Sequence, residues 1–396
     1  MKNHKDYTGS HLVAMTLKSA GVKNIFTLAG DHVLPILDVL SEDHFNLYDT
    51  RHEQAAAHMA DAYGRITGQL GVAIYTTPGF ANAIPALSNA FHSESPMLSI
   101  SGCAELSELG RGAMQEIDQV AMASPITKGS WMVTDPNRIP DMISHAIRVA
   151  FTGRRGPVHL TIPVDIQQMG ISSTDFNSNI TPTYDDHTLG TTDQIQNIVN
   201  LMQNSKSPLI ILGSGASYSN TGEAFKELID VTKFPLMTEG DSRGLVADTH
   251  PYNMGFFDLG LNKAAKMIKN ADLVILMGRK QDLIIGYAME PTIRGKTKII
   301  QIDPDSTVIG RNRKVDIGIA GNVANITKQI TQEAKKYEWV EQEWCASLRH
   351  AHASQQKELT ELSKSESPMH ASYAVSYTHL RAHETDSYLV CRLLLE

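Results

Sequence analysis

The feature that most constrains the fold is an alternation of short apolar runs with longer segments of helical period, which starts close to the N-terminus. Apolar runs at 24–28, 45–48, 72–76, 97–101 and 158–162 predict strands, and the segments 10–20, 53–67, 80–92 and 139–151 predict helices. Such alternation is typical of a parallel sheet with helices on both faces. The sequence therefore predicts an α/β fold that begins with a doubly wound domain at 1–167.

A second α/β pattern follows a polar segment. Residues 168–192 are rich in Ser, Thr, Asn and Asp, so we expect a linker there. Strands are then predicted at 209–212, 235–238, 273–277 and 298–302, with helices at 224–232, 263–269 and 324–337. We expect a second doubly wound, Rossmann-like domain at 193–340, followed by a charged helical stretch.

Charge and cysteine content narrow the classes of partner and of site. The 396 residues carry 35 Lys and Arg against 43 Asp and Glu, a net charge of -8, so no nucleic-acid partner is expected. Three distant cysteines without a CxxC pair indicate neither a disulfide framework nor a zinc site. The N-terminal residues lack the apolar stretch of a signal peptide, and no run reaches membrane length, so we expect a cytoplasmic protein without a membrane partner.

Glu53 is the first candidate site residue, because it follows a predicted strand and opens an Ala-rich helix. Thr50 and Glu53 have the spacing of a capping box, which would explain the glutamate by helix stability alone. The functional alternative is a ligand-binding carboxylate, since α/β sheets bind ligands at the carboxyl ends of their strands. His52 and His58 flank Glu53 without the HExxH spacing, so no metal site is expected.

Two glycine-containing turns also follow predicted strands. The first, Thr76 to Asn82, combines Pro78 and Gly79 and is either a plain loop or a ligand-facing turn. The second contains Gly213 and Gly215, with Glu239 at the end of the next strand. That arrangement resembles a dinucleotide fingerprint without its third glycine. It leaves open an NAD-dependent dehydrogenase, or a non-catalytic nucleotide-binding or assembly module.

Longer segments resemble the thiamine-diphosphate-dependent family that includes acetolactate synthase, oxalyl-CoA decarboxylase and 2-hydroxyacyl-CoA lyase. The similar segments are RHEQAAAHMADAYGRITGQLGVAI, PGFAN, AMQEIDQ, PITK, GRRGPVHLTIPVDIQQ, ADLVILMG and IIQIDPD, in one order from about residue 8 to residue 320. The resemblance implies a pyrimidine-binding domain followed by a central domain. It also implies decarboxylation or carboligation of a 2-oxo acid, in a homodimer or homotetramer at full length.

The resemblance assigns roles to particular residues. Glu53 is implied to bond a ring nitrogen of the cofactor's aminopyrimidine, and Gln115 to reach into the active site. Gly30, Pro78, Gly79 and Asn82 fall where the family lines the cofactor. In the central domain, which holds FAD or an ADP moiety in some members, the corresponding positions are Gly213, Gly278 and Asp303.

Departures from the family concern the substrate and the C-terminal part. Met114 and Val164 replace the Phe and Lys usual in acetolactate synthases, which leaves the substrate open. The GDG motif and its following Asn, which hold the diphosphate through magnesium, are not found in the sequence. We expect 341–375 to be a linker and the start of a truncated diphosphate-binding domain, 376–396 to be a foreign tail, and this chain to be inactive alone.

Overall fold

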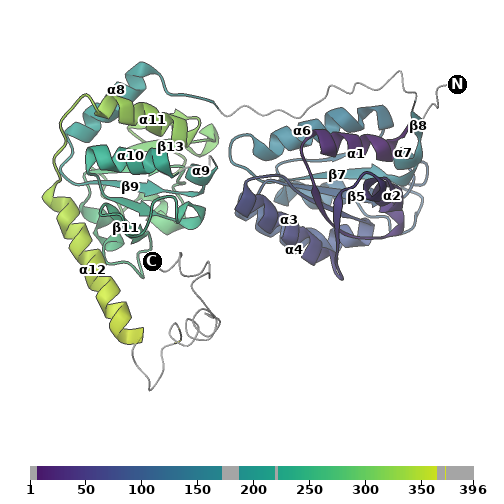
Figure 1. Cartoon of the computed structure of the whole chain (residues 1–396), viewed down its shortest axis with the longest axis horizontal. Helices are drawn as coiled ribbons and strands as arrows, with labels where there is room; N and C mark the ends of the chain where they lie inside the picture. The colour runs from purple at the N-terminus through teal and green to yellow at the C-terminus, as the bar shows by residue number, and fades with distance from the viewer. Residues whose placement is uncertain (1–6, 172–186, 219–221, 364–370, 372–396) are drawn as a thin grey trace. The chain divides into compact units, whose positions relative to one another are not determined.

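The computed structural model describes residues 7–171, 187–218, 222–363 and 371, and the chain divides into two compact units, Met1–Asp186 and His187–Glu396 (Figure 1). Most of the predicted linker, the expected start of a third domain and the expected foreign tail at 376–396 lie outside the described residues. Among the described residues, no helix combines the length and the hydropathy needed to cross a membrane.

The first unit is built on a six-stranded parallel sheet in the order β3-β2-β4-β5-β7-β6. The strands are β2 (Asn24–Leu28), β3 (Asn46–Asp49), β4 (Gly71–Tyr75), β5 (Met97–Cys103), β6 (Ser130–Met132) and β7 (Pro157–Pro163). A separate antiparallel pair joins β1 (Tyr7–Thr8) to β8 (Gly170–Ile171). The predicted α/β class is confirmed.

Helices cover both faces of this sheet, α1 and α6 on one side and α3 and α4 on the other (Figure 1). The helical segments are α1 (Gly9–Ser19), η1 (Asp31–Val33), α2 (Leu34–Glu42), α3 (Glu53–Thr67), α4 (Thr77–His92), α5 (Gln119–Ala123), η2 (Ser124–Ile126), η3 (Pro136–Arg138), α6 (Ile139–Phe151) and α7 (Val164–Gln168). Strand β4 shows why two cores form: Val72 and Ile74 pack under α1 and α6, while Ala73 and Tyr75 pack under α3 and α4.

The second unit repeats the architecture with a parallel sheet in the order β11-β10-β9-β12-β13-β14. Its strands are β9 (Pro208–Leu212), β10 (Leu236–Thr238), β11 (Asn253–Phe256), β12 (Leu273–Met277), β13 (Lys298–Asp303) and β14 (Ile317–Ala320). Its helical segments are α8 (Thr192–Gln203), α9 (Ser214–Ser217), α10 (Glu223–Thr232), η4 (Gly240–Ser242), η5 (Ala265–Asn270), η6 (Leu283–Ala288), η7 (Ser306–Val308), α11 (Val323–Ala334) and α12 (Glu343–Ser363).

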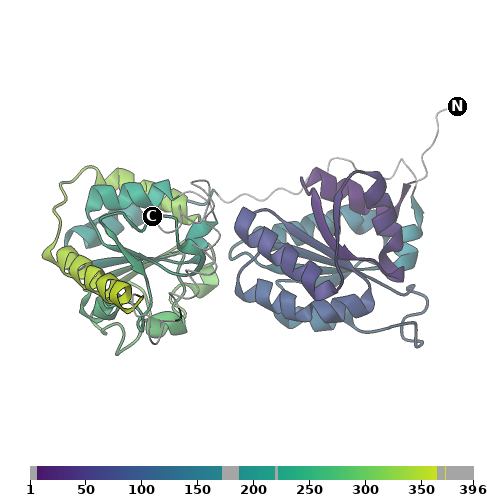
Figure 2. The same ribbon diagram turned by 60° about the horizontal axis from the view of Figure 1, so that its bottom comes forward.

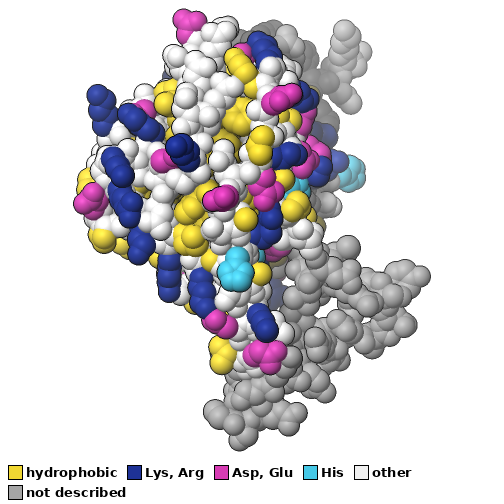
Figure 3. Space-filling view, turned by 90° about the vertical axis from the view of Figure 1, so that its left-hand side faces the viewer, with side chains coloured by type: hydrophobic (Ala, Val, Ile, Leu, Met, Phe, Trp, Pro, Cys, Tyr) yellow, Lys and Arg dark blue, Asp and Glu magenta, His cyan; other side chains and the backbone are white. Residues whose placement is uncertain are grey.

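One face of the second sheet packs against α8, α10 and α11, and the other packs against η5 and the first turns of α12 (Figure 2). On the face shown in Figure 3, Lys and Arg side chains are numerous along the left edge, and acidic and hydrophobic side chains are mixed among them. The negative net charge therefore does not produce a uniformly acidic surface.

The differences from the predicted elements are local. The helix predicted at 263–269 is the 3-10 segment η5, because so short a stretch cannot sustain an α-helix by its own propensity. Elements that were not predicted are the helices α2, α5, α7, α8 and α9 and the short strands β1, β6, β8, β11 and β14. Strand β6 is half-buried and only three residues long, so its sequence carries almost no alternation.

Candidate functional site

Glu53 is the first residue of α3, at the carboxyl end of the first sheet. The helix is capped by His52, whose Nδ1 accepts a hydrogen bond from the Gln54 amide at 3.2 Å. The expected capping box between Thr50 and Glu53 is wrong. Thr50 Oγ1 donates to the carbonyl groups of Thr27 and His52 instead, and a residue at the first helical position cannot reach back as one at the third does.

The Glu53 carboxylate is held against the start of α4. Its side chain is buried, with the residue 9% exposed, and Oε2 accepts a hydrogen bond from Asn82 Nδ2 at 3.0 Å. A Cβ atom at Gly79 would lie 2.8 Å from Glu53 Oε1 and 2.6 Å from Cγ, so only glycine allows this approach. Pro78 lies in the first turn of α4, where its missing N–H costs nothing.

One oxygen of the Glu53 carboxylate, Oε1, stays available for a hydrogen bond to a ligand. Glu53 Oε1 has no hydrogen-bond partner among the described residues, and it is not fully enclosed. Burial, with a smaller contribution from the charge of Glu53, raises the pKa of Tyr75, which keeps that phenol neutral beneath the site. The arrangement can therefore accept a hydrogen bond, or share a proton, with one ligand donor at Oε1.

The turn that carries Gly79 also contacts the loop after β2. A Cβ atom at Gly30 would lie 2.7 Å from Thr76 Cγ2, so glycine is required there too. The next residues bring in His32, whose Nδ1 lies 3.1 Å from both Thr76 Oγ1 and Thr77 Oγ1. His32 is not among the predicted site residues, because a single histidine in a loop has no periodicity or motif to mark it.

Gln115 lies elsewhere in the first unit, in the loop between β5 and α5. It is exposed, has a left-handed backbone with φ of 57°, and makes no hydrogen bond to Glu53 or Asn82 in the described structure. The neighbouring Glu116 folds this loop by accepting from the amides of Gly110 and Ala113, which lowers its pKa.

Gln119, four residues later in the same AMQEIDQ run, is the glutamine that the structure buries. Its Nε2 donates to the Gly102 carbonyl at 3.0 Å and to Thr77 Oγ1 at 3.3 Å. In the sequence only its place in the AMQEIDQ run marks Gln119, because Gln115 lies in a loop before α5 and no helical period relates the two residues.

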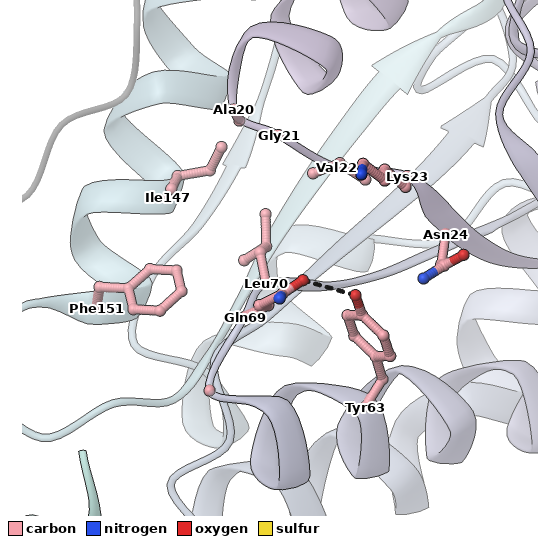
Figure 4. Close-up of a pocket in the computed structure, with 11 residues that line it drawn as sticks. Ala20, Gly21, Val22, Lys23, Asn24, Tyr63, Gln69, Leu70, Ile147 and Phe151 are labelled. Carbon is pink, nitrogen blue, oxygen red and sulfur yellow. Dashed lines mark hydrogen bonds between the residues drawn. The ribbon is translucent and has the colours of Figure 1, made fainter. Parts of the chain in front are cut away.

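A pocket of about 520 Å³ at the amino end of the first sheet lies away from this edge (Figure 4). Asn24 opens β2 there, Leu70 precedes β4, and Tyr63 Oη donates to Gln69 Oε1 at 2.7 Å. Since Glu53 follows the opposite ends of the strands, this pocket does not contribute to the candidate site.

In the second unit, Gly213, Gly215 and Gly278 pack two turns against each other. The amide of Gly213 donates to the Met277 carbonyl and that of Gly215 to the Gly278 carbonyl, both at 3.0 Å. A Cβ atom at Gly278 would lie 2.2 Å from the Ala216 nitrogen. The amides that would face a pyrophosphate in a dinucleotide fold are thus engaged within the protein. Asp303 is fully buried and accepts from the Asp305 amide.

Glu239, the acidic residue of the possible fingerprint, faces a cation of its own chain. Its Oε2 lies 3.3 Å from Arg279 Nε, while the Arg279 guanidinium makes two hydrogen bonds to Asp282, at 2.6 and 2.8 Å. Burial raises the pKa of Glu239, against the opposing charge of Arg279. With its glycines and its carboxylate engaged internally, the NAD-dependent dehydrogenase reading lacks support.

Among the described residues, no three His, Cys, Asp or Glu side chains gather in a way that could hold a metal ion.

Two family models match the chain. Residues 7–122 match the thiamine pyrophosphate enzyme N-terminal TPP binding domain, and residues 195–330 match the central domain of the same enzymes. The chain belongs to the thiamine pyrophosphate enzyme family. Glu53, Gly79 and Asn82 therefore lie in its N-terminal TPP-binding domain, and the Gly213 turn lies in its central domain.

Individual relatives agree with this family. A probable acetolactate synthase large subunit of Methanocaldococcus jannaschii is 33% identical over 332 residues, which cover 81% of this chain and 55% of that protein. The 2-hydroxyacyl-CoA lyase 1 of Homo sapiens is 29% identical over 95% of this chain and 65% of that protein. The acetolactate synthase large subunit of Lactococcus lactis is 29% identical over 84% of this chain and 58% of its own length. The matched residues thus span between 55% and 65% of the length of these relatives.

Proposed function

We propose that the protein is a thiamine-diphosphate-dependent decarboxylase or carboligase that acts on a small-molecule 2-oxo acid. The observation that carries the proposal is the Glu53 carboxylate, which is buried, held through Oε2 by Asn82 and open at Oε1. Such a group fits a planar heterocycle with one protonated ring nitrogen at the edge of the sheet.

Each residue of this edge has a separate task. Glu53 Oε1 shares a proton with the ring nitrogen, and its burial strengthens that interaction because little water competes for the carboxylate. Asn82 keeps the carboxylate in one rotamer, and Gly79 leaves the space that the side chain needs. When bound, thiamine diphosphate supplies the carbon nucleophile and the electron sink that decarboxylation of a 2-oxo acid requires.

The remaining parts of the site belong to the proposal as well. We propose that the ligands of the diphosphate and of magnesium come from a further segment of the longer protein, in a homodimer or homotetramer, and that this chain is inactive without them. Gln115, which is exposed on its loop, remains proposed as a residue that reaches the substrate. FAD or ADP remains an occupant proposed for the central domain, although Gly213 and Gly278 donate their amides within the protein. Release of flavin or ADP on denaturation of the purified protein would support it.

The test is turnover of 2-oxo acids with thiamine diphosphate and magnesium by the protein extended to the length of its relatives. Glu53→Gln keeps the size of the side chain and an acceptor for Asn82, but it removes the shared proton. We expect kcat to fall at least about 100-fold, in the range of a lost acid-base group. Glu42→Gln, at an exposed glutamate of α2, is the matched control and should leave kcat unchanged.

Unchanged turnover in the Glu53→Gln protein, with an intact fold by circular dichroism, would contradict the role of Glu53. Failure of the wild-type protein to bind thiamine diphosphate would contradict the proposed function as a whole.

A further inference from the structure

We propose that His32 is a proton acceptor of this site and presents its Nε2 atom to an oxygen of the bound substrate, an assignment that rests on the function proposed above. His32 lies in η1, directly after β2. Because the chain leaves β2 for β3 on one side and returns to β4 on the other, the carboxyl ends of β2 and β4 flank the point where doubly wound sheets bind ligands.

The backbone of His32 is fixed from two sides. Its carbonyl accepts a hydrogen bond from Gln167 Nε2 at 2.6 Å. A Cβ atom at Gly102 would lie 1.8 Å from the same carbonyl oxygen, so the absence of a side chain at the end of β5 lets the loop pack there. The fixed backbone therefore holds the imidazole in a defined orientation, which a group that transfers protons requires.

The hydrogen bonds around Thr77 favour one of the two tautomers of His32. The Thr77 hydroxyl donates its only proton to the Gly102 carbonyl at 2.9 Å, so its oxygen can only accept from its other neighbours. One of them is Gln119 Nε2 at 3.3 Å, and the other is His32 Nδ1 at 3.1 Å. Thr77 thus favours the tautomer with the proton on Nδ1, which leaves a lone pair on Nε2.

Nε2 is the free end of this ring. It has no hydrogen-bond partner in the described structure, and it is not fully enclosed although the residue is only 5% exposed. Because His32 is almost buried while Nε2 stays accessible and without a protein partner at the ligand-binding edge, a ligand atom can complete it there.

Burial and uncharged contact groups favour the neutral form of the ring. Burial lowers the pKa of His32, and the carboxylate of Asp31 partly opposes that effect. The groups that contact the imidazole from the turn after β4 and the start of α4 are the uncharged hydroxyls of Thr76 and Thr77. The nearby side chains of Gln119 and Gln167 are uncharged amides. At neutral pH the ring is therefore a base with an available lone pair.

The proposed step is removal of a hydroxyl proton as a product carbonyl forms. The O–H bond of the hydroxyl group on the substrate-derived carbon breaks, and the hydroxyl proton moves to His32 Nε2. The O–H electron pair becomes the second bond of the new C=O group, while the pair of the breaking carbon-carbon bond stays with the departing carbon. The imidazolium then returns the proton to water, so protons and electrons balance.

Histidine NMR on the unmodified chain tests the tautomer without any turnover. In a ¹⁵N-histidine spectrum, the signals missing from His32→Asn identify His32. We expect the Nδ1–H form at neutral pH and a titration midpoint below the ordinary value of about 6.5. An Nε2–H tautomer, or a midpoint at or above the ordinary value, would overturn the inference.

Kinetics of the protein at the length of its relatives tests the role. Asn retains a donor near Thr76 and Thr77 but has no atom at the position of Nε2, so His32→Asn should fold while kcat falls about 100-fold to 1,000-fold. The acid limb of the kcat profile should disappear with it. His58→Gln, at an exposed histidine of α3, is the control and should change neither.

The outcomes separate the two proposals. Wild-type turnover together with unchanged kcat in His32→Asn overturns the role of His32 and leaves the proposed function standing. Loss of kcat in both Glu53→Gln and His32→Asn, with thiamine diphosphate still bound, supports both. A wild-type protein that neither binds thiamine diphosphate nor turns over any 2-oxo acid overturns both. If His32→Asn does not fold, through-bond assignment of the His32 ring signals in the unmodified chain still determines the tautomer and decides the inference.

Discussion

At the scale of single residues, the surroundings of a buried polar side chain in the first unit set its protonation state, as His159 shows. His159 is fully buried in β7, with Nδ1 2.9 Å from Ser99 Oγ and Nε2 3.0 Å from Thr161 Oγ1. Tyr75 Oη joins the same network through Ser99 at 2.6 Å. Because every partner is uncharged, burial lowers the pKa of His159 to about 3. The histidine is a neutral structural group, in contrast to the open Nε2 of His32.

This pKa predicts acid sensitivity of the first unit. Between about 6.5 and 3 the unfolded chain binds a proton at His159 that the folded unit does not, so the free energy of unfolding should fall as pH falls. The expected slope is about 1.4 kcal/mol per pH unit for this one group. Urea unfolding read by hydrogen exchange in β5 measures it, and His159→Gln should reduce the slope by that amount.

Loss of stability at pH 7 is also expected for His159→Gln, by about 1 to 3 kcal/mol, because the network loses its central member. His58→Gln changes an exposed histidine and should alter neither quantity. An equal pH slope in all three proteins would mean that His159 does not titrate between the folded and unfolded states.

At the scale of elements, the turns after the parallel strands position both units' candidate residues. The turn after β4 places Gly79 against Glu53, and the turn after β12 places Gly278 against the turn after β9. Gly278 has a φ of 62° and no room for a side chain, whereas Gly240 has a φ of 58° with open space around its Cα. Comparing substitutions at these two glycines therefore separates the energetic cost of the left-handed backbone from the cost of a steric clash.

Gly278→Ala should therefore destabilise the second unit more than Gly240→Ala does. Both substitutions force alanine into the left-handed region, which costs about 1 to 2 kcal/mol. Only at Gly278 would the new Cβ also lie 2.2 Å from a backbone nitrogen, so a total loss above about 3 kcal/mol is expected. Urea unfolding of the two variants measures the difference, and equal losses would show that the β9 and β12 turns separate at little cost.

At the scale of the whole molecule, the two units have separate hydrophobic cores. The cores of the first unit draw on residues between Leu12 and Ile166, and those of the second on residues between Ile195 and Leu348. In each unit, helices of the same unit cover both faces of the parallel sheet, so the apolar surface of the sheet is buried without the other unit.

We therefore expect residues 1–186 to fold as a separate polypeptide. Its thermal midpoint should lie within a few degrees of that of the same unit in the whole chain, as read by hydrogen exchange in β5. A fragment that lacks near-ultraviolet circular dichroism, or that exchanges throughout, would show that the first unit depends on residues beyond 186.

The sequence alone determined the fold class, most strands, the bounds of α3 and, through family resemblance, the placement of Glu53, Gly79 and Asn82. These depend on local periodicity or on contiguous motifs, which a linear reading captures. Only the tertiary structure brought His32 to Thr77, buried Gln119 against Thr77 while Gln115 stays exposed, and paired Glu239 with Arg279. Each of these contacts joins residues about 40 or more positions apart, where hydrogen-bond geometry and desolvation, rather than residue order, select the partner.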